Sequence, residues 1–251
     1  MDIKEYFQKN HKVALAFSGG TDSAYLLHEA VSNGADVRPY FIKSPFQPDF
    51  ELNDAIKLAK QFKSDLQIIE YDILQVPEVS SNNSRRCYYC KKALFSLLKE
   101  TAAADGYDLV IDGTNASDNP DNRPGMQALN EMGIQSPLRI CGLTKDEIRV
   151  RSRAAGLFTW DKPAYACLAT RVPTDMEIDN EKLRKVELAE QILFDNGFED
   201  FRIRLFHDAA RIQLREQDMR LLLKLRQDLN RRLYELFPVL LLDLTTREEK
   251  N

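Results

Sequence analysis

The feature that most constrains the fold is the segment Ser18–Ser23, SGGTDS, which joins an apolar run to a segment of helical period. Adjacent glycines let backbone N–H groups converge on an anion, and the following helix places its positive N-terminal dipole at the same point. Such a loop needs a strand before it and a helix after it. The segment therefore predicts the first βα turn of an open α/β sheet, at the edge where such sheets bind ligands.

Apolar runs and segments of helical period alternate up to about residue 115, which is the pattern of βαβ units. The expected strands are 13–17, 37–42, 66–71 and 109–112. The expected core faces of two helices are Ala24, Leu27, Ala30 and Val31, and then Leu94, Leu97 and Leu98. The predicted fold class is α/β, with a doubly wound parallel sheet covered by helices on both faces.

The rest of the chain indicates a smaller α+β domain. Thr144–Glu147 has capping-box spacing and predicts a helix that ends near Gly156. The stretch 157–179 has little helical period and is expected to be a long loop, of the kind that tends to be functional in compact enzymes. A helix with core residues between 183 and 193, strand-like FRIRLF and ARIQL, another helix and VLLLDL follow. We expect domains at 1–172 and 173–251.

Composition narrows the possible partners. A net charge of -4 and a pI near 5.6 argue against broad nucleic-acid binding, although they are compatible with a small anionic substrate. No apolar run reaches membrane-spanning length, and the first residues lack a signal-peptide pattern. We therefore expect a cytoplasmic protein with a small-molecule substrate and neither a membrane nor a nucleic-acid partner.

The loop Ser18–Ser23 lacks the Gly-Lys-Ser/Thr ending of a Walker A loop. Ser18, Thr21 and Ser23 can supply hydroxyl donors, whereas Asp22 would repel a phosphate unless a cation stood between them. The acidic residue therefore implies Mg²⁺. The alternative is a simple Gly-Gly turn in which Thr21 is an ordinary helix N-cap.

The loop and its strand resemble the PP-loop of the N-type ATP pyrophosphatases, and Asp112–Asp118, DGTNASD, resembles a second element of that superfamily. The resemblance implies a HUP-like fold, ATP with Mg²⁺ as cofactors, and adenylation of a substrate oxygen with loss of pyrophosphate. It also implies a catalytic role for Asp22. The implied ATP-binding residues are Ser18, Gly19, Gly20, Thr21, Asp22, Ser23, Gly113 and Thr114.

Three of the four cysteines are candidates for chemistry. Cys87 and Cys90 have CxxC spacing, and Cys167 lies in the long loop. Three thiolates suit an iron–sulfur cluster with one open iron, whereas a structural zinc site would need a fourth ligand. Neighbouring cations would also favour a reactive Cys167 thiolate. Cys141 is expected to be a small buried hydrophobe.

Several further motifs resemble one family along nearly the whole chain, namely the LarE family of ATP-dependent sulfur transferases. These motifs are RPG at Arg123–Gly125, SPL at Ser136–Leu138, LTKDEIR from Leu143, WDKPA from Trp160 and ACLATR around Cys167. The resemblance implies adenylation of a carboxylate of pyridinium-3,5-biscarboxylic acid mononucleotide. Sulfur insertion then gives a thiocarboxylate, in the biosynthesis of the nickel-pincer nucleotide. Residues 1–172 would form the PP-loop domain, and 173–251 a substrate or oligomerisation domain.

Two sulfur sources are known in this family. In one, the cysteine that matches Cys167 gives up its own sulfur and becomes dehydroalanine. In the other, cysteines matching Cys87, Cys90 and Cys167 hold a [4Fe–4S] cluster whose open iron carries the sulfur. The presence of all three cysteines favours the three-cysteine subtype, although the CxxC could be incidental or structural.

Arginines on the predicted C-terminal strands are candidates for binding the substrate phosphate. Arg202 and Arg204 alternate on one face of one strand, and Arg211 lies on the next. A solvated sheet face is the alternative, and the resemblance favours the phosphate site at Arg202 and Arg204. Glu187 and Glu190 could face the same cleft, without a role that spacing can assign.

Departures from the family pattern put the precise substrate in doubt. Asp175 stands where a glycine is expected, Gln213 replaces an acidic residue, and Ile140-Cys141 interrupts the approach to LTK. Rival functions are a tRNA thiolase, a glutamine-dependent amidotransferase and a non-catalytic adenine-nucleotide sensor. The thiolase would need a basic RNA-binding surface, and the amidotransferase a source of ammonia. A homo-oligomer is expected from the family alone.

Overall fold

A computed structural model of the protein describes residues 1–118 and 124–247. The described chain forms two compact units, unit 1 (Met1–Val79 with Arg85–Ala164) and unit 2 (Ser80–Ser84 with the chain from Tyr165 onwards). Arg123 of the RPG motif lies outside the described residues. Among the helices in the described ranges, none combines the length and apolar character needed to cross a membrane.

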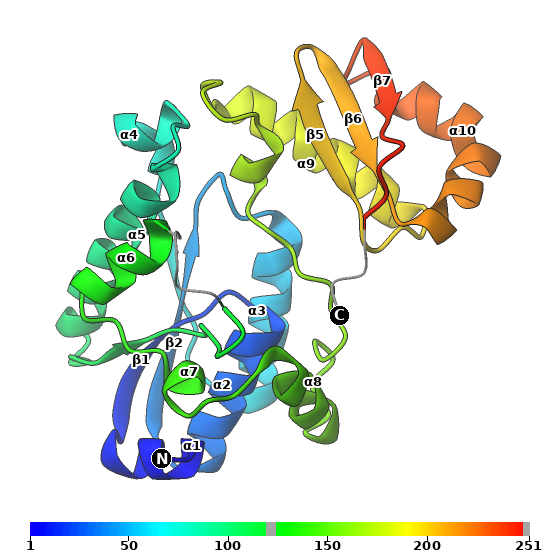
Figure 1. Cartoon of the computed structure of the whole chain (residues 1–251). Coiled ribbons are helices and arrows are strands. Elements are labelled where there is room, and N and C mark those ends of the chain that lie inside the picture. The colour runs from blue at the N-terminus through cyan, green and yellow to red at the C-terminus, as the bar shows by residue number, and fades with distance from the viewer. Residues whose placement is uncertain (119–123, 248–251) are drawn as a thin grey trace. The chain divides into compact units, whose positions relative to one another are not determined.

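Unit 1 is built on a parallel sheet of four strands in the order β3-β2-β1-β4 (Figure 1). The strands are β1 (Lys12–Ala16), β2 (Asp36–Lys43), β3 (Gln67–Glu70) and β4 (Val110–Ile111). Each lies within or overlaps one of the four runs expected from the sequence, so the predicted α/β class is confirmed. β1 is central, and its carboxyl end leads directly into Ser18–Ser23.

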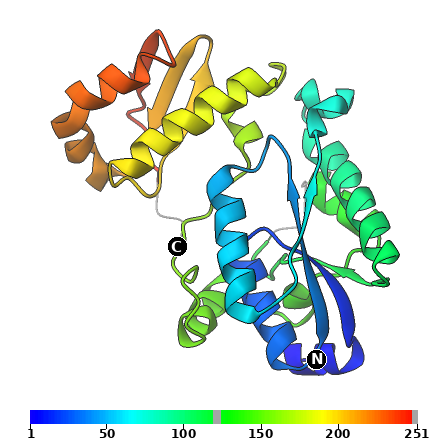
Figure 2. The ribbon, with the colours of Figure 1, turned by 180° about the vertical axis from the view of Figure 1, so that it is seen from behind.

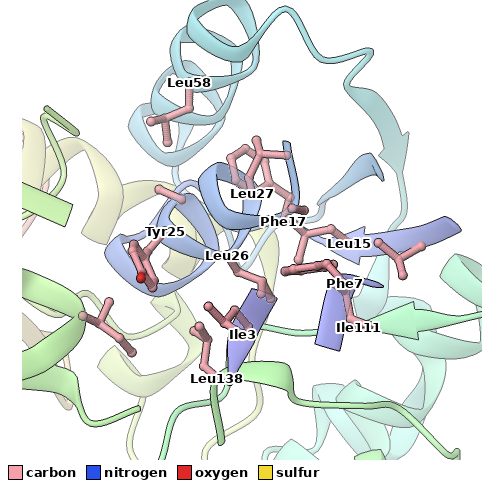
Figure 3. Close-up of a cluster of buried hydrophobic side chains, with 14 of the residues drawn as sticks. Ile3, Phe7, Leu15, Phe17, Tyr25, Leu26, Leu27, Leu58, Ile111 and Leu138 are labelled. Atoms are coloured by element: carbon pink, nitrogen blue, oxygen red, sulfur yellow. The ribbon is translucent and has the colours of Figure 1, made fainter. Parts of the chain in front are cut away.

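Helices cover both faces of this sheet because alternate residues of β1 point to opposite sides. Val13 and Leu15 enter one core cluster, and Ala14 enters another. Figure 2 shows the arrangement from behind, and Figure 3 shows the first cluster, with side chains from β1, α2 and α3. The helices on that face are α1 (Ile3–Lys9), α2 (Thr21–Ser32), α3 (Asp49–Phe62), α7 (Pro137–Ile140) and α8 (Lys145–Ala154). Those on the other are α5 (Arg86–Ala104) and α6 (Pro124–Glu131).

The helical faces are mostly as predicted. Ala24, Leu27 and Ala30 are buried, but the expectation for Val31 is wrong, since it lies at the end of α2 and is 37% exposed. The predicted capping box is confirmed: Thr144 accepts from the Glu147 N–H, while the Glu147 side chain accepts from the Thr144 N–H. Two short elements, η1 (Ile73–Gln75) and α4 (Pro77–Ser80), precede α5.

Unit 2 is a small α+β arrangement, as the sequence predicts. Its sheet has the order β5-β6-β7, antiparallel between β5 (Arg202–Phe206) and β6 (Ala209–Gln213) and parallel between β6 and β7 (Val239–Leu242). The longer helices are α9 (Asn180–Asp195) and α10 (Met219–Leu233), with short 3₁₀ turns η2 (Leu168–Arg171) and η3 (Glu216–Asp218).

The entry to unit 2 is stabilised by a buried side chain from far upstream. Asn82 is fully buried, and its amide donates to the carbonyls of Pro173 at 2.7 Å and Met176 at 2.9 Å. Asp175 between them has a φ of 66°, in the left-handed region that favours glycine. The position where the family pattern has glycine is thus one where the backbone favours it.

Candidate active site

Ser18–Ser23, the phosphate loop, has its backbone shaped by two glycines. Gly19 has a φ of 69°, and a Cβ there would lie 2.9 Å from the backbone N of Ala55 in α3. Gly20 is the N-cap of α2 and provides no side-chain hydrogen bond to the helix N-terminus. The first-turn N–H groups of α2 therefore lack a side-chain cap, which suits an anion at this point.

The hydroxyls of the phosphate loop differ in their bonding. Ser18 Oγ and Ser23 Oγ lie 3.1 Å apart. Thr21 is buried and donates its hydroxyl to the Thr159 carbonyl at 2.7 Å. Thr21 is the first helical residue and not the N-cap, so the simple capping alternative does not describe this turn. Its contribution at the helix N-terminus is a backbone N–H, and the predicted role of its hydroxyl stays a prediction.

The segment Asp112–Asp118 packs directly against the phosphate loop. A Cβ at Gly113 would lie 3.0 Å from the backbone N of Ser23, so any other residue would push the two segments apart by a few tenths of an ångström. Asp112 is buried, and its carboxylate accepts from the hydroxyl of Thr114 at 2.6 Å and from that of Ser136 at 2.6 Å. The two predicted ATP-binding segments are therefore neighbours in unit 1.

Lys145 supplies a cation at the phosphate loop. Its ammonium donates to both carboxylate oxygens of Asp22, at 2.8 and 2.9 Å, and both side chains are partly exposed. The Lys145 N–H also donates to Ser117 Oγ at 3.0 Å, which fixes the start of α8 against the second segment. The Asp22 carboxylate is thus paired with a cation of the protein, and the Mg²⁺ predicted beside it stays a prediction.

A cavity of about 290 Å³ opens beside the phosphate loop, near the lower end of the range for small-molecule sites. Its polar wall includes Ser18, Asp22 and Thr114. Its apolar wall includes Phe41 of β2 and Phe95 of α5. All of its lining residues belong to unit 1, so the phosphate loop and α5 share one concave site.

The CxxC pair lies at the start of α5, the same helix that lines the cavity. Cys87 is exposed and Cys90 is partly buried, and their three-residue spacing places them on one side of the helix. Lys91, next along the helix, lines the cavity. Cys141 is partly buried against the main core, and burial raises its thiol pKa, which agrees with the expected packing role.

Cys167 belongs to unit 2, where it caps η2. Arg171 and Glu190 form an almost fully buried ion pair in this unit, with 2.8 Å between Nε and Oε1. Burial lowers the pKa of Arg171, but the charges of Glu190, Tyr165 and Cys167 raise it, and the net shift is upward. Lys162, the other cation near Cys167 in sequence, pairs with Asp54 at 2.6 Å in unit 1.

The predicted phosphate-binding arginines lie in a cluster on the unit 2 sheet. Arg204 is directly opposite Arg211 across the β5–β6 pair. Burial, followed by the positive charges of Arg171 and Arg247, lowers the pKa of Arg202 to about 10. The pKa of Arg204 is also lowered, by burial and then by Arg171, Arg211 and Arg247. Cations that depress one another's pKa lie close together, which suits an anionic group.

Sequence reasoning assigned no role to Lys145 and Lys91. Lys145 directly follows the N-cap Thr144 within LTKDEIR, so its position in a motif was the available signal. Lys91 follows Cys90, and only the packing of α5 on the sheet places it at the cavity. Glu190, which spacing left without a role, holds Arg171. The described residues contain no group of three His, Cys, Asp or Glu side chains arranged as a metal site.

The fold and the loop together define an α/β protein of the HUP-like class. No protein-family model matches the chain. It is 32% identical to the pyridinium-3,5-bisthiocarboxylic acid mononucleotide synthase of Lactiplantibacillus plantarum, over 93% of this chain and 86% of that protein. An uncharacterized protein of Synechocystis sp. is 36% identical over 85% of this chain and 80% of its own length. Another from Methanocaldococcus jannaschii is 34% identical, covering 86% of this chain and 82% of that protein. The chain therefore belongs to the family of that synthase, the LarE family.

Proposed function

We propose that the protein is an ATP-dependent sulfur transferase that forms a thiocarboxylate in nickel-pincer nucleotide biosynthesis. The relative from Lactiplantibacillus plantarum is named for a bisthiocarboxylic acid mononucleotide product. The observation that carries the ATP step is the uncapped α2 N-terminus, which opens into the cavity beside Asp22 and Lys145. The proposed substrate is pyridinium-3,5-biscarboxylic acid mononucleotide.

The first step is activation of a carboxylate. A carboxylate oxygen of the substrate attacks the α-phosphorus of ATP, and pyrophosphate leaves, so that an acyl adenylate forms. The phosphate loop and the α2 dipole would hold the phosphates, since N–H groups at a helix N-terminus favour negative charge. Lys145 offsets the charge of Asp22. Mg²⁺ usually takes one or two carboxylates plus substrate phosphates, a requirement that Asp22 fits.

The second step is displacement of AMP by sulfur, because adenylation converts a poor leaving group into a good one. In the favoured route Cys87, Cys90 and Cys167 would hold a [4Fe–4S] cluster, which would supply a transferable sulfide. The CxxC pair offers two thiols on one side of α5. In the alternative, the Cys167 sulfur attacks the acyl carbon and AMP leaves. Loss of the Cys167 α-proton then breaks its Cβ–S bond, which leaves dehydroalanine and the thiocarboxylate.

Arg202 and Arg204 would bind the substrate phosphate. Support comes from the cluster of guanidinium groups on β5 and β6, which concentrates positive charge on one sheet. Glu190 is engaged with Arg171 and is therefore a poor candidate for a free general base. Cys167, Arg202 and Arg204 all belong to unit 2, whereas Cys87 and Cys90 belong to unit 1.

Anaerobic purification with iron and sulfide analysis, followed by intact mass before and after turnover, tests the sulfur source. The cluster route predicts bound iron, unchanged protein mass and repeated turnover. Stoichiometric loss of sulfur from Cys167 without iron would instead establish the sacrificial route. Absence of substrate-dependent pyrophosphate release would contradict the enzyme itself and favour a nucleotide sensor.

A further inference from the structure

The carboxylate of Glu190 is saturated with hydrogen bonds in the interior of unit 2. It accepts from Arg171 Nε at 2.8 Å and Nη2 at 3.2 Å, and from the Ile203 N–H at 3.1 Å. The Tyr165 hydroxyl donates a further bond at 2.5 Å. Because both oxygens have donors, the carboxylate is held in one orientation. It joins α9, β5 and the segment that leads to Cys167.

The same guanidinium bonds to the backbone before Cys167 and to a side chain after it. Arg171 Nη1 donates to the Ala166 carbonyl at 2.9 Å and to Thr170 Oγ1 at 2.8 Å. The Thr170 hydroxyl in turn donates to the Cys167 carbonyl at 2.9 Å. Residues 165–171, the Cys167 loop, are therefore fixed by one buried ion pair.

Tyr165 is the residue that joins this loop to the arginine cluster. Its ring lies beneath two guanidinium groups, with Cζ of Arg171 at 4.5 Å and Cζ of Arg202 at 5.3 Å from the ring centroid. An aromatic face attracts cations, so the ring stabilises two positive charges that repel each other. The hydroxyl of the same ring is fixed by Glu190. Loss of the Tyr165 side chain would thus loosen the loop, whereas Arg202 keeps its bond to the Phe201 carbonyl at 2.5 Å and its contact with Asp200 at 3.7 Å.

We propose that Tyr165 is a positioning residue that holds the Cys167 loop in register with Arg202. The inference rests on the proposed function, in which Arg202 binds the substrate phosphate and Cys167 takes part in sulfur delivery. The relative position of Cys167 and Arg202 would determine whether the sulfur can attack the activated acyl carbon. A misplacement of about 1 Å in such a site can cost about 100-fold in rate.

The test compares Tyr165→Leu, which loses ring and hydroxyl, with Tyr165→Phe, which keeps the ring. Tyr107→Leu is the matched control, because Tyr107 in unit 1 also donates to a carboxylate, at 2.8 Å from Asp36, and carries a cation, Lys12, at 4.8 Å. Misplacement of the loop predicts a fall of about 10- to 100-fold in kcat for thiocarboxylate formation in Tyr165→Leu. Its KM for the mononucleotide and its pyrophosphate release should change little, and Tyr165→Phe should recover most of the rate.

A second readout does not depend on catalysis. Iodoacetamide labelling of Cys167 in the full-length protein, in reducing buffer with chelator and followed by peptide mass spectrometry, should be several-fold faster in Tyr165→Leu than in the wild type. Tyr107→Leu should label at the wild-type rate. A labelling rate and a kcat that equal the wild-type values in both Tyr165 variants would overturn the inference. An inactive wild type with faster labelling in Tyr165→Leu would instead contradict the proposed function alone. If Tyr165→Leu fails to fold, Tyr165→Met replaces it, and wild-type labelling with an unchanged kcat in that variant would overturn the inference.

Discussion

The phosphate loop of unit 1 and the Cys167 loop of unit 2 are held in place by different means. The phosphate loop is shaped by backbone packing, since Gly19 approaches the α3 main chain too closely for any other residue and Gly113 packs tightly against Ser23. The Cys167 loop is held by buried side chains, above all the Arg171–Glu190 pair. A loop shaped by main-chain packing depends on a few glycines close to it. A loop held by side chains depends on residues scattered along the chain.

The largest expected effect is in unit 2. Glu190→Leu should cost about 3–5 kcal/mol of stability, because it leaves the Arg171 charge buried without its partner. The double variant with Arg171→Met should recover most of that loss. Native-state hydrogen exchange on β5 and β6 is the suitable measurement, since the only tryptophan, Trp160, reports on unit 1. A single variant that loses less than about 1 kcal/mol would show that the pair does not hold this unit.

The next effect tests the backbone basis of unit 1. Gly19→Ala should cost about 2–4 kcal/mol, since it combines a left-handed φ with a clash against the α3 backbone. ATP binding by calorimetry should fall at least tenfold. Gly20→Ala is the control for stability, because the nearest atom to its Cβ would be Ser18 Oγ at 3.4 Å and its φ is ordinary. An equal loss of stability in the two variants would contradict the steric explanation.

Lys145 contributes a side chain to the phosphate loop of unit 1, which is otherwise shaped by backbone packing. Lys145→Met should leave the Asp22 charge facing the nucleotide phosphates and weaken ATP binding by about tenfold, or about 1.4 kcal/mol. Lys185→Met serves as the control, since it removes an ion pair with Glu181 in unit 2. Unchanged ATP affinity in Lys145→Met would mean that the backbone alone determines how tightly the phosphate loop binds ATP.

The smallest effect concerns a backbone position in unit 2. Asp175→Ala should destabilise the segment by about 1 kcal/mol, because alanine tolerates the left-handed region poorly. Asp175→Gly should be nearly neutral, since relief of strain is offset by greater freedom of the unfolded chain. The N–H of residue 175 donates to the Asn82 carbonyl at 3.0 Å. Its hydrogen-exchange rate would measure the local stability of both variants. Loss of stability in the glycine variant would contradict this reasoning.

The same contrast explains what the sequence could predict. The strands and Ser18–Ser23 were predictable because hydrophobic period and adjacent glycines express local backbone requirements. The partners of Glu190 were not, since they come from the Cys167 loop and from Ile203 and meet only after folding. Asn82 likewise carries no local signal for its contacts with Pro173 and Met176. The exposure of Val31 depends on where α2 ends against the core.

In the proposed mechanism unit 1 activates the substrate, and Cys167 is needed only to deliver sulfur. The direct measurement is pyrophosphate release and product mass with Mg-ATP and pyridinium-3,5-biscarboxylic acid mononucleotide, in the wild type and in Cys167→Ala. We expect substrate-dependent pyrophosphate release in both proteins and a thiocarboxylate product only in the wild type. A Cys167→Ala protein that makes thiocarboxylate, or one that folds and binds ATP but releases no pyrophosphate, would contradict this mechanism.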